Sequence, residues 1–114
     1  MTTTDSLALA QLARKALLDK KGVNPVLLDV RALSGVTDFY LIITGTSAPH
    51  LKAMVEELRH QHQTAGAARK RQAGDPDSGW LVVDCLDVVV HLFLPHIREY
   101  YALEDLWSDA PRVA

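Results

Sequence analysis

Residues 80–94 decide the fold of this chain; they read Trp-Leu-Val-Val-Asp-Cys-Leu-Asp-Val-Val-Val-His-Leu-Phe-Leu. Two apolar runs rich in valine, 80–83 and 88–94, flank the connection 84–87, which is short enough for an antiparallel hairpin. Side chains alternate between the faces of a strand, and both faces of the second run are apolar. Such a strand needs cover on both sides, so we expect it at the centre of a sheet.

The residues before this hairpin predict elements that could supply the cover. Gly45 follows a buried strand and Ser47 is a suitable N-cap, so the chain is expected to turn tightly there from a strand into a helix. Asn24-Pro25 reads as a break that precedes a strand. Apolar spacing then predicts a helix between residues 6 and 22, strands at 26–30 and 39–44, and a helix from 48 to about 66.

Downstream of that helix, the turn-rich segment 67–79 is predicted to include a short edge strand near Arg69-Lys70-Arg71. Pro95 is placed to start a short helix whose spacing continues through Glu104. The predicted fold class is therefore α/β (α+β), with a mixed, mostly five-stranded sheet and helices packed on it.

Length and composition indicate an ordinary globular protein. The chain has 114 residues, 48% of them hydrophobic and 23% charged, so we expect one domain over residues 1–114. The net charge of −2 does not favour direct nucleic-acid binding, and no apolar run is long enough to span a membrane. The start lacks a secretory pattern and Cys85 is the only cysteine, so a cytoplasmic location is expected.

Polar residues near the predicted strand ends loosely resemble a nucleotidyltransferase layout. Ser47 after Gly45 could face phosphate, and Asp84 and Asp87 could hold Mg²⁺. However, the two aspartates lie three residues apart across a turn and no glycine-rich phosphate loop with a lysine is present. We therefore favour hairpin-turn roles for them, and expect no catalytic residue, metal or cofactor.

The histidines do not complete a metal-binding pattern. His60 and His62 are two apart on a predicted helix and face different directions, without a cysteine or carboxylate at suitable spacing. His91 lies inside an apolar strand, where a hydrogen-bonded imidazole of a core or an interface is the usual case.

Large apolar and aromatic side chains are concentrated at the start of the hairpin and near the C-terminus. Such a surplus, rich in Trp and Tyr, has the composition of interface hot spots and predicts a protein partner. For Leu103 and Tyr100, burial in the core is an equal alternative. The set comprises Trp80, Tyr100, Tyr101, Leu103, Leu106 and Trp107.

These residues belong to motifs through which the chain resembles the iojap family, the ribosomal silencing factors (RsfS-like) of bacteria and organelles. The resemblance covers roughly residues 8–110, and its strength comes from the order and spacing of several motifs. They are Thr37-Asp38, Thr44-Gly45-Thr46-Ser47 with His50, Trp80-Leu81-Val82-Val83-Asp84, Asp87-Val88-Val89-Val90-His91, and Arg98-Glu99-Tyr100-Tyr101-Ala102-Leu103-Glu104-Asp105-Leu106-Trp107.

The resemblance implies a nucleotidyltransferase-like fold without catalysis, and a repressor of translation. Family members bind the large ribosomal subunit through its ribosomal protein fourteen and sterically block association with the small subunit. Acidic groups, including Glu104 and Asp105, are expected to meet basic ribosomal side chains. The partner-binding residues that the resemblance implies, together with the hairpin turn, are Trp80, Asp84, Leu86, Asp87, Tyr101, Leu103, Leu106 and Trp107.

The chain departs from the family pattern at three places. Ala73-Gly74 stands where Glu-Gly is usual, Leu86 stands where a glycine or polar residue is usual, and Pro49 replaces a common arginine. Two alternatives remain open: a Mg²⁺-dependent nucleotidyltransferase-like enzyme, and a scaffold protein that forms a homodimer through its aromatic patch.

Overall fold

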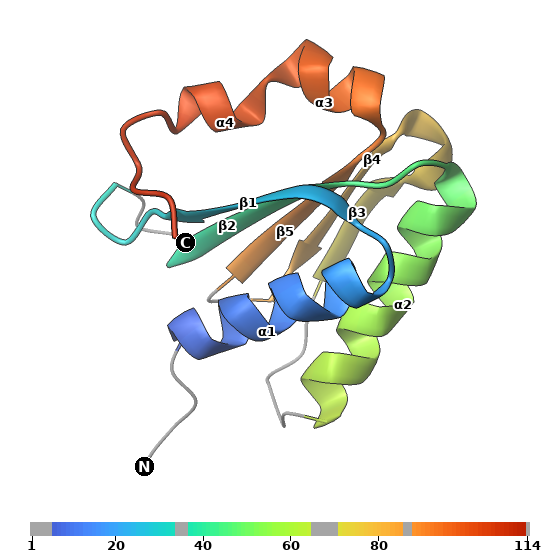
Figure 1. Cartoon of the computed structure of the whole chain (residues 1–114), viewed down its shortest axis with the longest axis horizontal. Coiled ribbons are helices and arrows are strands. Elements are labelled where there is room, and N and C mark those ends of the chain that lie inside the picture. Colours follow the sequence, from blue (N-terminus) through green and yellow to red (C-terminus); the bar gives the residue numbers. More distant parts are fainter. Residues whose placement is uncertain (1–5, 34–36, 65–70, 86–87, 114) are drawn as a thin grey trace.

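The computed structural model describes residues 6–33, 37–64, 71–85 and 88–113. Five strands form one mixed sheet in the order β1-β2-β5-β4-β3, in which only β2 and β5 are parallel neighbours (Figure 1). The predicted fold class is therefore confirmed. The strands span Val23–Asp29 (β1), Phe39–Thr44 (β2), Arg71–Asp75 (β3), Trp80–Asp84 (β4) and Val88–Phe93 (β5).

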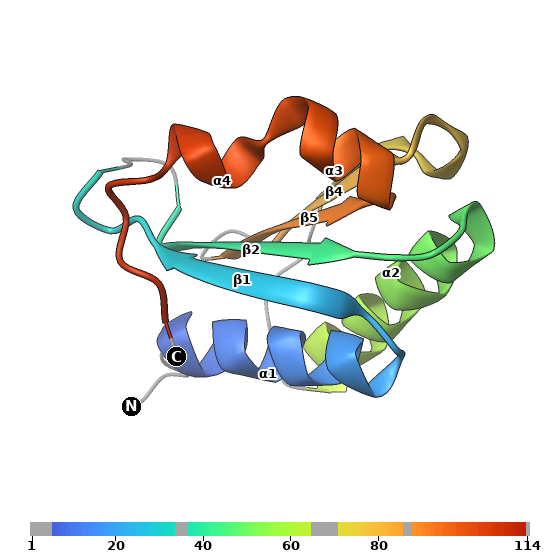
Figure 2. The same ribbon diagram turned by 45° about the horizontal axis from the view of Figure 1, so that its top comes forward.

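Helices cover the two faces of this sheet unequally (Figure 2). The longer helices α1 (Ser6–Asp19) and α2 (Ala48–Thr64) lie on one face. The short helices α3 (Pro95–Tyr101) and α4 (Leu103–Leu106) lie across the other. The sheet is thus the middle layer of three, and its β5 strand is central, as the apolar run predicts.

The core has two parts because strand side chains alternate between the faces. The part between the sheet and helices α1 and α2 is the larger and includes Leu41 and Ile43 of β2. The part between the sheet and helices α3 and α4 is built around Ile42 and Phe93, with half-buried aromatic side chains packed against it. Partly buried side chains pack against both parts, but the aromatic ones among them belong to the second.

The hairpin and the strand-to-helix turn are confirmed. Trp80 pairs with Phe93 and Asp84 with Val89 in an antiparallel register. Ser47 caps α2, because its Oγ accepts a hydrogen bond from the backbone N–H of His50 at 3.2 Å. The predicted edge strand near the arginines is β3, which ends at Asp75.

Asn24-Pro25 does not break the chain before a strand, so that prediction is wrong. β1 begins at Val23 and includes both residues. The register shifts between Val23 and Val26, and Asn24 has a φ of 52°. A proline is tolerated at such an irregularity because the strand edge there does not need its missing N–H.

The C-terminal residues protect the outer edge of β1, which the sequence pattern did not indicate. The N–H of Asp29 donates to the carbonyl oxygen of Pro111 at 2.9 Å, and that of Val113 to Leu27 at 2.8 Å. These bonds satisfy backbone groups that an open edge would leave available for pairing with another chain.

A single helix running from Pro95 through Glu104 is not observed. The chain leaves the helix at Ala102, which has φ 45° and ψ 49°, and resumes it at Leu103. A glycine usually occupies a position with this left-handed conformation, because other residues seldom adopt it. Here the residue is an alanine, so the sequence does not indicate the joint.

Candidate partner-binding surface

Residues 95–107, here called the arm, comprise α3, the joint at Ala102 and α4. Pro95 begins the arm at the first helical position, where its missing N–H leaves no bond unmade. The N–H of Ala102 closes α3 on the carbonyl oxygen of Arg98 at 2.8 Å. No residue of either helix is buried, so the arm lies on the sheet and presents much of its own surface to solvent.

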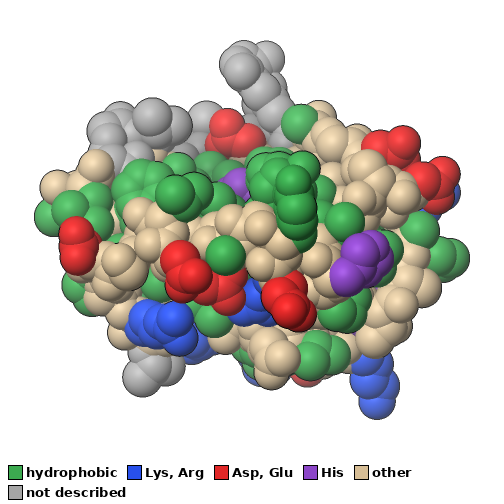
Figure 3. All heavy atoms as spheres, turned by 90° about the horizontal axis from the view of Figure 1, so that it is seen from above, with side chains coloured by type: hydrophobic (Ala, Val, Ile, Leu, Met, Phe, Trp, Pro, Cys, Tyr) green, Lys and Arg blue, Asp and Glu red, His purple; other side chains and the backbone are tan. Residues whose placement is uncertain are grey.

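Three large side chains of the arm are exposed. Tyr100 is 79% exposed, Leu106 75% and Tyr101 47%. Figure 3, which views the molecule from the side of α3 and α4, shows hydrophobic side chains gathered on this face with acidic side chains beside them. An exposed apolar patch on a small protein commonly marks a binding site for another protein.

An aromatic cluster beneath the arm supports these exposed side chains. Tyr101 lies 4.6 Å from Trp80 between ring centroids, and Trp80 stacks on Phe93 at 5.1 Å. The ring centroids of Trp107 and Tyr40 lie 5.1 Å apart. The exposed ring of Tyr101 is therefore seated on the half-buried ring of Trp80, which stacks in turn on the buried ring of Phe93 in the second part of the core.

His91 is the polar member of this cluster. It is 9% exposed, and its Nδ1 accepts a hydrogen bond from Trp80 Nε1 at 3.2 Å. This bond requires Nδ1 without a proton, so the neutral ring carries its hydrogen on Nε2. Burial lowers the pKa of His91 from 6.5 to about 4, which keeps the imidazole neutral near pH 7. Its interpretation as a hydrogen-bonded imidazole of the core is confirmed.

Acidic side chains flank the exposed residues of the arm. Glu99, Asp105 and Asp109 are all exposed. Glu104, which we expected to face a basic partner, instead turns inward and pairs with Arg98 at 3.0 Å. The negative charge available to a partner therefore comes from Glu99, Asp105 and Asp109, of which only Asp105 was predicted.

The structure brings some of the predicted site residues together and separates others. Trp80, Tyr101 and Trp107 all belong to the aromatic cluster. Leu103 is half-buried against the core, whereas Leu106 points away from it, and Tyr100, for which core burial was an alternative, is exposed.

The hairpin turn contributes less to this surface than the sequence suggests. Asp84 lies on the same face as Trp80 but four residues further along β4, which is about 13 Å away. Leu86 and Asp87 lie outside the described residues.

Sequence reasoning missed two supporting residues, Tyr40 and Phe93. Both were assigned to strands with two apolar faces, and nothing in the strand pattern of either shows which face is only thinly covered. The pairing of Trp80 with Phe93 across the hairpin was a usable indication, because directly paired side chains share a face.

The arrangement that a magnesium-dependent enzyme would need is not assembled from Ser47 and Asp84. Ser47 follows the end of β2, where Thr44 pairs with Phe93. Asp84 pairs with Val89, which lies four residues earlier on β5, so the two side chains belong to opposite ends of the sheet. Among the described residues, no group of three His, Cys, Asp or Glu side chains could hold a metal ion.

The chain is thus an α/β domain on a mixed sheet that exposes an apolar and aromatic patch flanked by acids. The particular family follows from sequence. The chain belongs to the family described as ribosomal silencing factor during starvation, RsfS, whose model matches residues 3–114. The resemblance to the iojap and ribosomal silencing factor family is thereby confirmed.

Individual relatives agree with this assignment. The ribosomal silencing factor RsfS of Halalkalibacterium halodurans is 42% identical over 105 residues, covering 92% of this chain and 90% of that protein. A crystal structure of a Chromobacterium violaceum protein superposes with a TM-score of 0.87 at 32% identity, covering 92% of this chain and 88% of the other. A mouse protein named mitochondrial assembly of ribosomal large subunit protein 1 is 42% identical over 76 residues, 63% of this chain and 33% of that protein.

Within the described part of the chain, none of the helices has the length and apolar character that crossing a membrane requires.

Proposed function

We propose that this protein is a ribosomal silencing factor that acts in the cytoplasm without catalysing a reaction. It binds the large ribosomal subunit through ribosomal protein fourteen and sterically blocks association with the small subunit, which represses translation. The observation that carries this proposal is the exposed patch of Tyr101 and Leu106 on the arm, in which Tyr101 is seated on Trp80 and exposed acids lie nearby in the chain. The names of the relatives support the ribosome as the partner, and that of the mouse protein supports the large subunit.

The composition of the patch suits a basic protein surface. Tyr101 and Leu106 supply apolar area whose removal from water provides affinity. Glu99 and Asp105 lie beside them and favour approach of a positively charged partner, while the net charge of −2 opposes direct contact with ribosomal RNA. Of the other predicted contact residues, Leu103 and Trp107 support the patch from beneath, and Asp84 would reach the edge of the interface.

A steric mechanism requires no chemistry at this surface. A domain with principal extents of 41 × 32 × 23 Å occupies space on the large subunit that the small subunit would otherwise enter. Repression then depends on the fraction of large subunits that carry the factor, which is set by its affinity and its concentration.

The test is co-sedimentation of the purified protein with isolated large subunits, isolated small subunits and assembled ribosomes. Binding to large subunits alone is expected, together with loss of subunit reassociation when small subunits are added. Measurement at two salt concentrations separates the charged contribution, which salt weakens, from the apolar one, which salt leaves in place. Absence of binding to large subunits would refute the proposal.

Free protein should be sedimented in the same experiment. A dimer that dissociates on adding large subunits would show that the patch closes on itself when unoccupied. Nothing in the arrangement of Ser47 and Asp84 favours the enzymatic alternative.

A further inference from the structure

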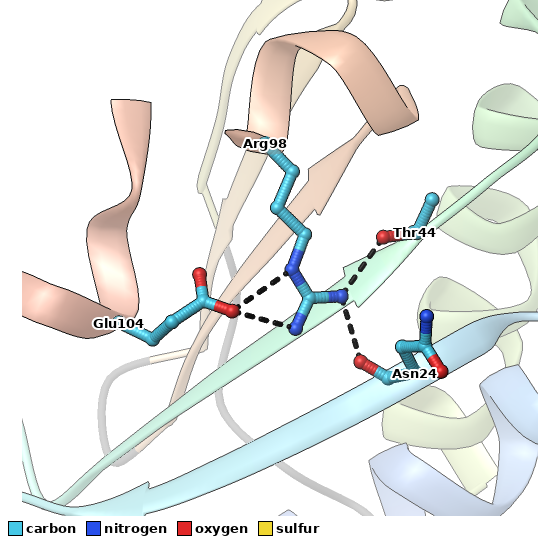
Figure 4. A network of polar contacts seen from close by, with 4 residues as sticks. All are labelled: Asn24, Thr44, Arg98 and Glu104. Carbon is cyan, nitrogen blue, oxygen red and sulfur yellow. Dashed lines mark hydrogen bonds and ion pairs between the residues drawn. The ribbon is translucent and has the colours of Figure 1, made fainter. Parts of the chain in front are cut away.

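Arg98 makes four side-chain hydrogen bonds, two that tie the arm to the sheet and two that join α3 to α4 within the arm (Figure 4). Its Nη1 donates to the carbonyl oxygen of Asn24 at 2.7 Å and to Thr44 Oγ1 at 2.8 Å. Its Nε and Nη2 donate to Glu104 Oε2 at 3.2 and 3.0 Å. One side chain of α3 therefore contacts β1, β2 and α4 at the same time.

The pair that Arg98 forms with Glu104 is largely removed from water. The Arg98 side chain is 11% exposed and that of Glu104 is 21% exposed. Loss of hydration offsets much of the attraction within such a pair, so its net contribution to stability is commonly small. The second oxygen of Glu104, Oε1, is also buried and has no hydrogen-bond partner within the described residues. Stability alone is therefore a poor explanation for this arrangement, whereas the fixed geometry of a guanidinium fork is a good one.

Apolar packing holds the arm through partly buried side chains only, among them Ile97, Leu103 and Trp107. Neither α3 nor α4 has a buried residue, and α4 has only four residues, too few to be stable alone. A hollow of about 660 Å³ lies beside Arg98 and is lined by residues of the arm and of the strands, including Pro95, Ala102 and Val23. Arg98 and Glu104 also line this hollow, so the hydrogen bonds of Arg98 join the arm to the strands at a place where side chains leave open space.

The joint at Ala102 makes this connection important for the exposed patch. Tyr101 precedes the joint and Leu106 follows it, so their relative position depends on the angle between α3 and α4. Arg98 belongs to α3 and Glu104 to α4, and their bonds fix that angle across the joint.

We propose that Arg98, acting through Glu104, Thr44 and the Asn24 carbonyl, is a positioning residue that presents Tyr101 and Leu106 as one partner-binding surface. The inference rests on the proposed function, because it assigns the arrangement of the arm to binding. The positioning role predicts that a variant without Arg98 can keep its fold and still lose the arrangement of Tyr101 and Leu106 that the partner binds.

The main test removes the pair without leaving one charge buried alone. The double variant Arg98→Met with Glu104→Gln keeps similar volume at both positions. Binding to isolated large subunits is expected to weaken by about tenfold or more. The matched control is Lys15→Met with Asp19→Asn, which removes an exposed ion pair on α1 and is expected to leave binding unchanged.

Hydrogen exchange separates positioning from a general structural role. In the double variant, the amides of Ala102, Asp105 and Ser108, which form the bonds within and after the arm, are expected to exchange about tenfold faster. Amides of the central strand β5 are expected to keep the wild-type rate. Equal loosening of the arm and of β5 would overturn the proposal, because it would show a merely structural role.

A single hydroxyl offers a finer test. Thr44→Val keeps the shape of the side chain but removes the acceptor for Arg98, whereas Thr44→Ser keeps the acceptor. Thr44→Val is expected to weaken binding, and Thr44→Ser is expected to bind like the wild type.

The possible failures are distinguishable. Failure of the wild-type protein to bind large subunits would refute the proposed function. If the wild type binds and the double variant binds within about twofold of it, the positioning role is refuted alone, whatever the exchange rates of the arm.

Discussion

The indole Nε1–H of Trp80 donates a hydrogen bond to Nδ1 of His91 at 3.2 Å, within an otherwise aromatic layer between sheet and arm. This bond requires a neutral imidazole, and burial keeps it so by lowering the pKa of His91 to about 4. The layer that supports the exposed patch is therefore sensitive to acid.

Stability is expected to fall as the pH is lowered from about 7 to 4. The unfolded chain protonates His91 near pH 6.5 while the folded protein protonates it near 4, so the unfolded state binds more protons in this window. The loss at pH 5 amounts to about 2 kcal/mol relative to pH 8. Urea titrations at several pH values measure it.

Two comparisons assign this effect to His91. His91→Gln is expected to flatten the pH dependence between 5 and 8, and His96→Gln, at an exposed position, is expected to retain it. Asp29, whose pKa is held below 3.8 by hydrogen bonds from Arg31, loses its stabilising contribution only at lower pH and does not interfere. An unchanged slope in His91→Gln would contradict the assignment.

Leu106→Ala is expected to impair binding without affecting the fold. The side chain is 75% exposed, so the free energy of unfolding should change by no more than about 0.5 kcal/mol. If Leu106 contacts the large subunit, its truncation should weaken binding by about 1–2 kcal/mol, measured by co-sedimentation over a range of subunit concentrations. Leu18→Ala, at a 44% exposed position on α1, is the matched control and should leave binding unchanged.

The tryptophans are less suitable for this purpose. Trp80 stacks on Phe93 and Trp107 packs against Tyr40, so their truncation would also open a cavity in the core. Reduced binding of those variants would not distinguish a lost contact from a displaced arm.

Ser47→Ala is expected to destabilise the protein by about 1 kcal/mol, because it removes the N-cap of α2. Thermal or urea unfolding measures the change. Ser47→Asp restores a cap and adds a negative charge at the helix N-terminus, so it should recover most of the loss. Normal stability of Ser47→Ala would contradict the assigned contribution of this cap.

The central hairpin could be predicted because its residues act locally. The valine-rich runs need cover on both faces, and the four-residue connection allows only an antiparallel return to an adjacent strand. The exposed character of the arm was partly predictable from its surplus of tyrosine and tryptophan.

Features that depend on tertiary contacts were not predictable. The spacing of Tyr101 and Glu104 continues a helical pattern, and nothing local reveals that Ala102 adopts a left-handed conformation. Likewise, the sequence pattern suggests that Glu104 is an exposed acid. Its pairing with Arg98 becomes visible only in the folded structure, where Arg98 also bonds Thr44 at the end of β2. Propensity and periodicity depend on residues that are close in sequence. The conformation of Ala102 and the burial of Glu104 depend instead on residues that are close only in the folded structure.

Two glycines provide a last test, because they are required for different reasons. Gly74 has a φ of +92°, and a Cβ there would lie 2.3 Å from the carbonyl oxygen of Trp80. A Cβ at Gly45 would lie 2.7 Å from Leu51 Cδ2 and 2.8 Å from Met54 Cε, which are the ends of flexible side chains. Backbone strain and a backbone clash cannot be relieved by a rotamer change, whereas the contacts at Gly45 can.

Gly74→Ala is therefore expected to cost about 2 kcal/mol or more, and Gly45→Ala about 1 kcal/mol, by urea unfolding. Because the clash at Gly74 falls on the backbone of Trp80, Gly74→Ala should also weaken binding to large subunits in material that remains folded. Gly45 contacts α2 on the opposite side of the sheet, so Gly45→Ala should bind normally once corrected for stability. The reverse order of destabilisation would show that the constraint at the strand-to-helix turn, and not the one beside Trp80, is the stricter.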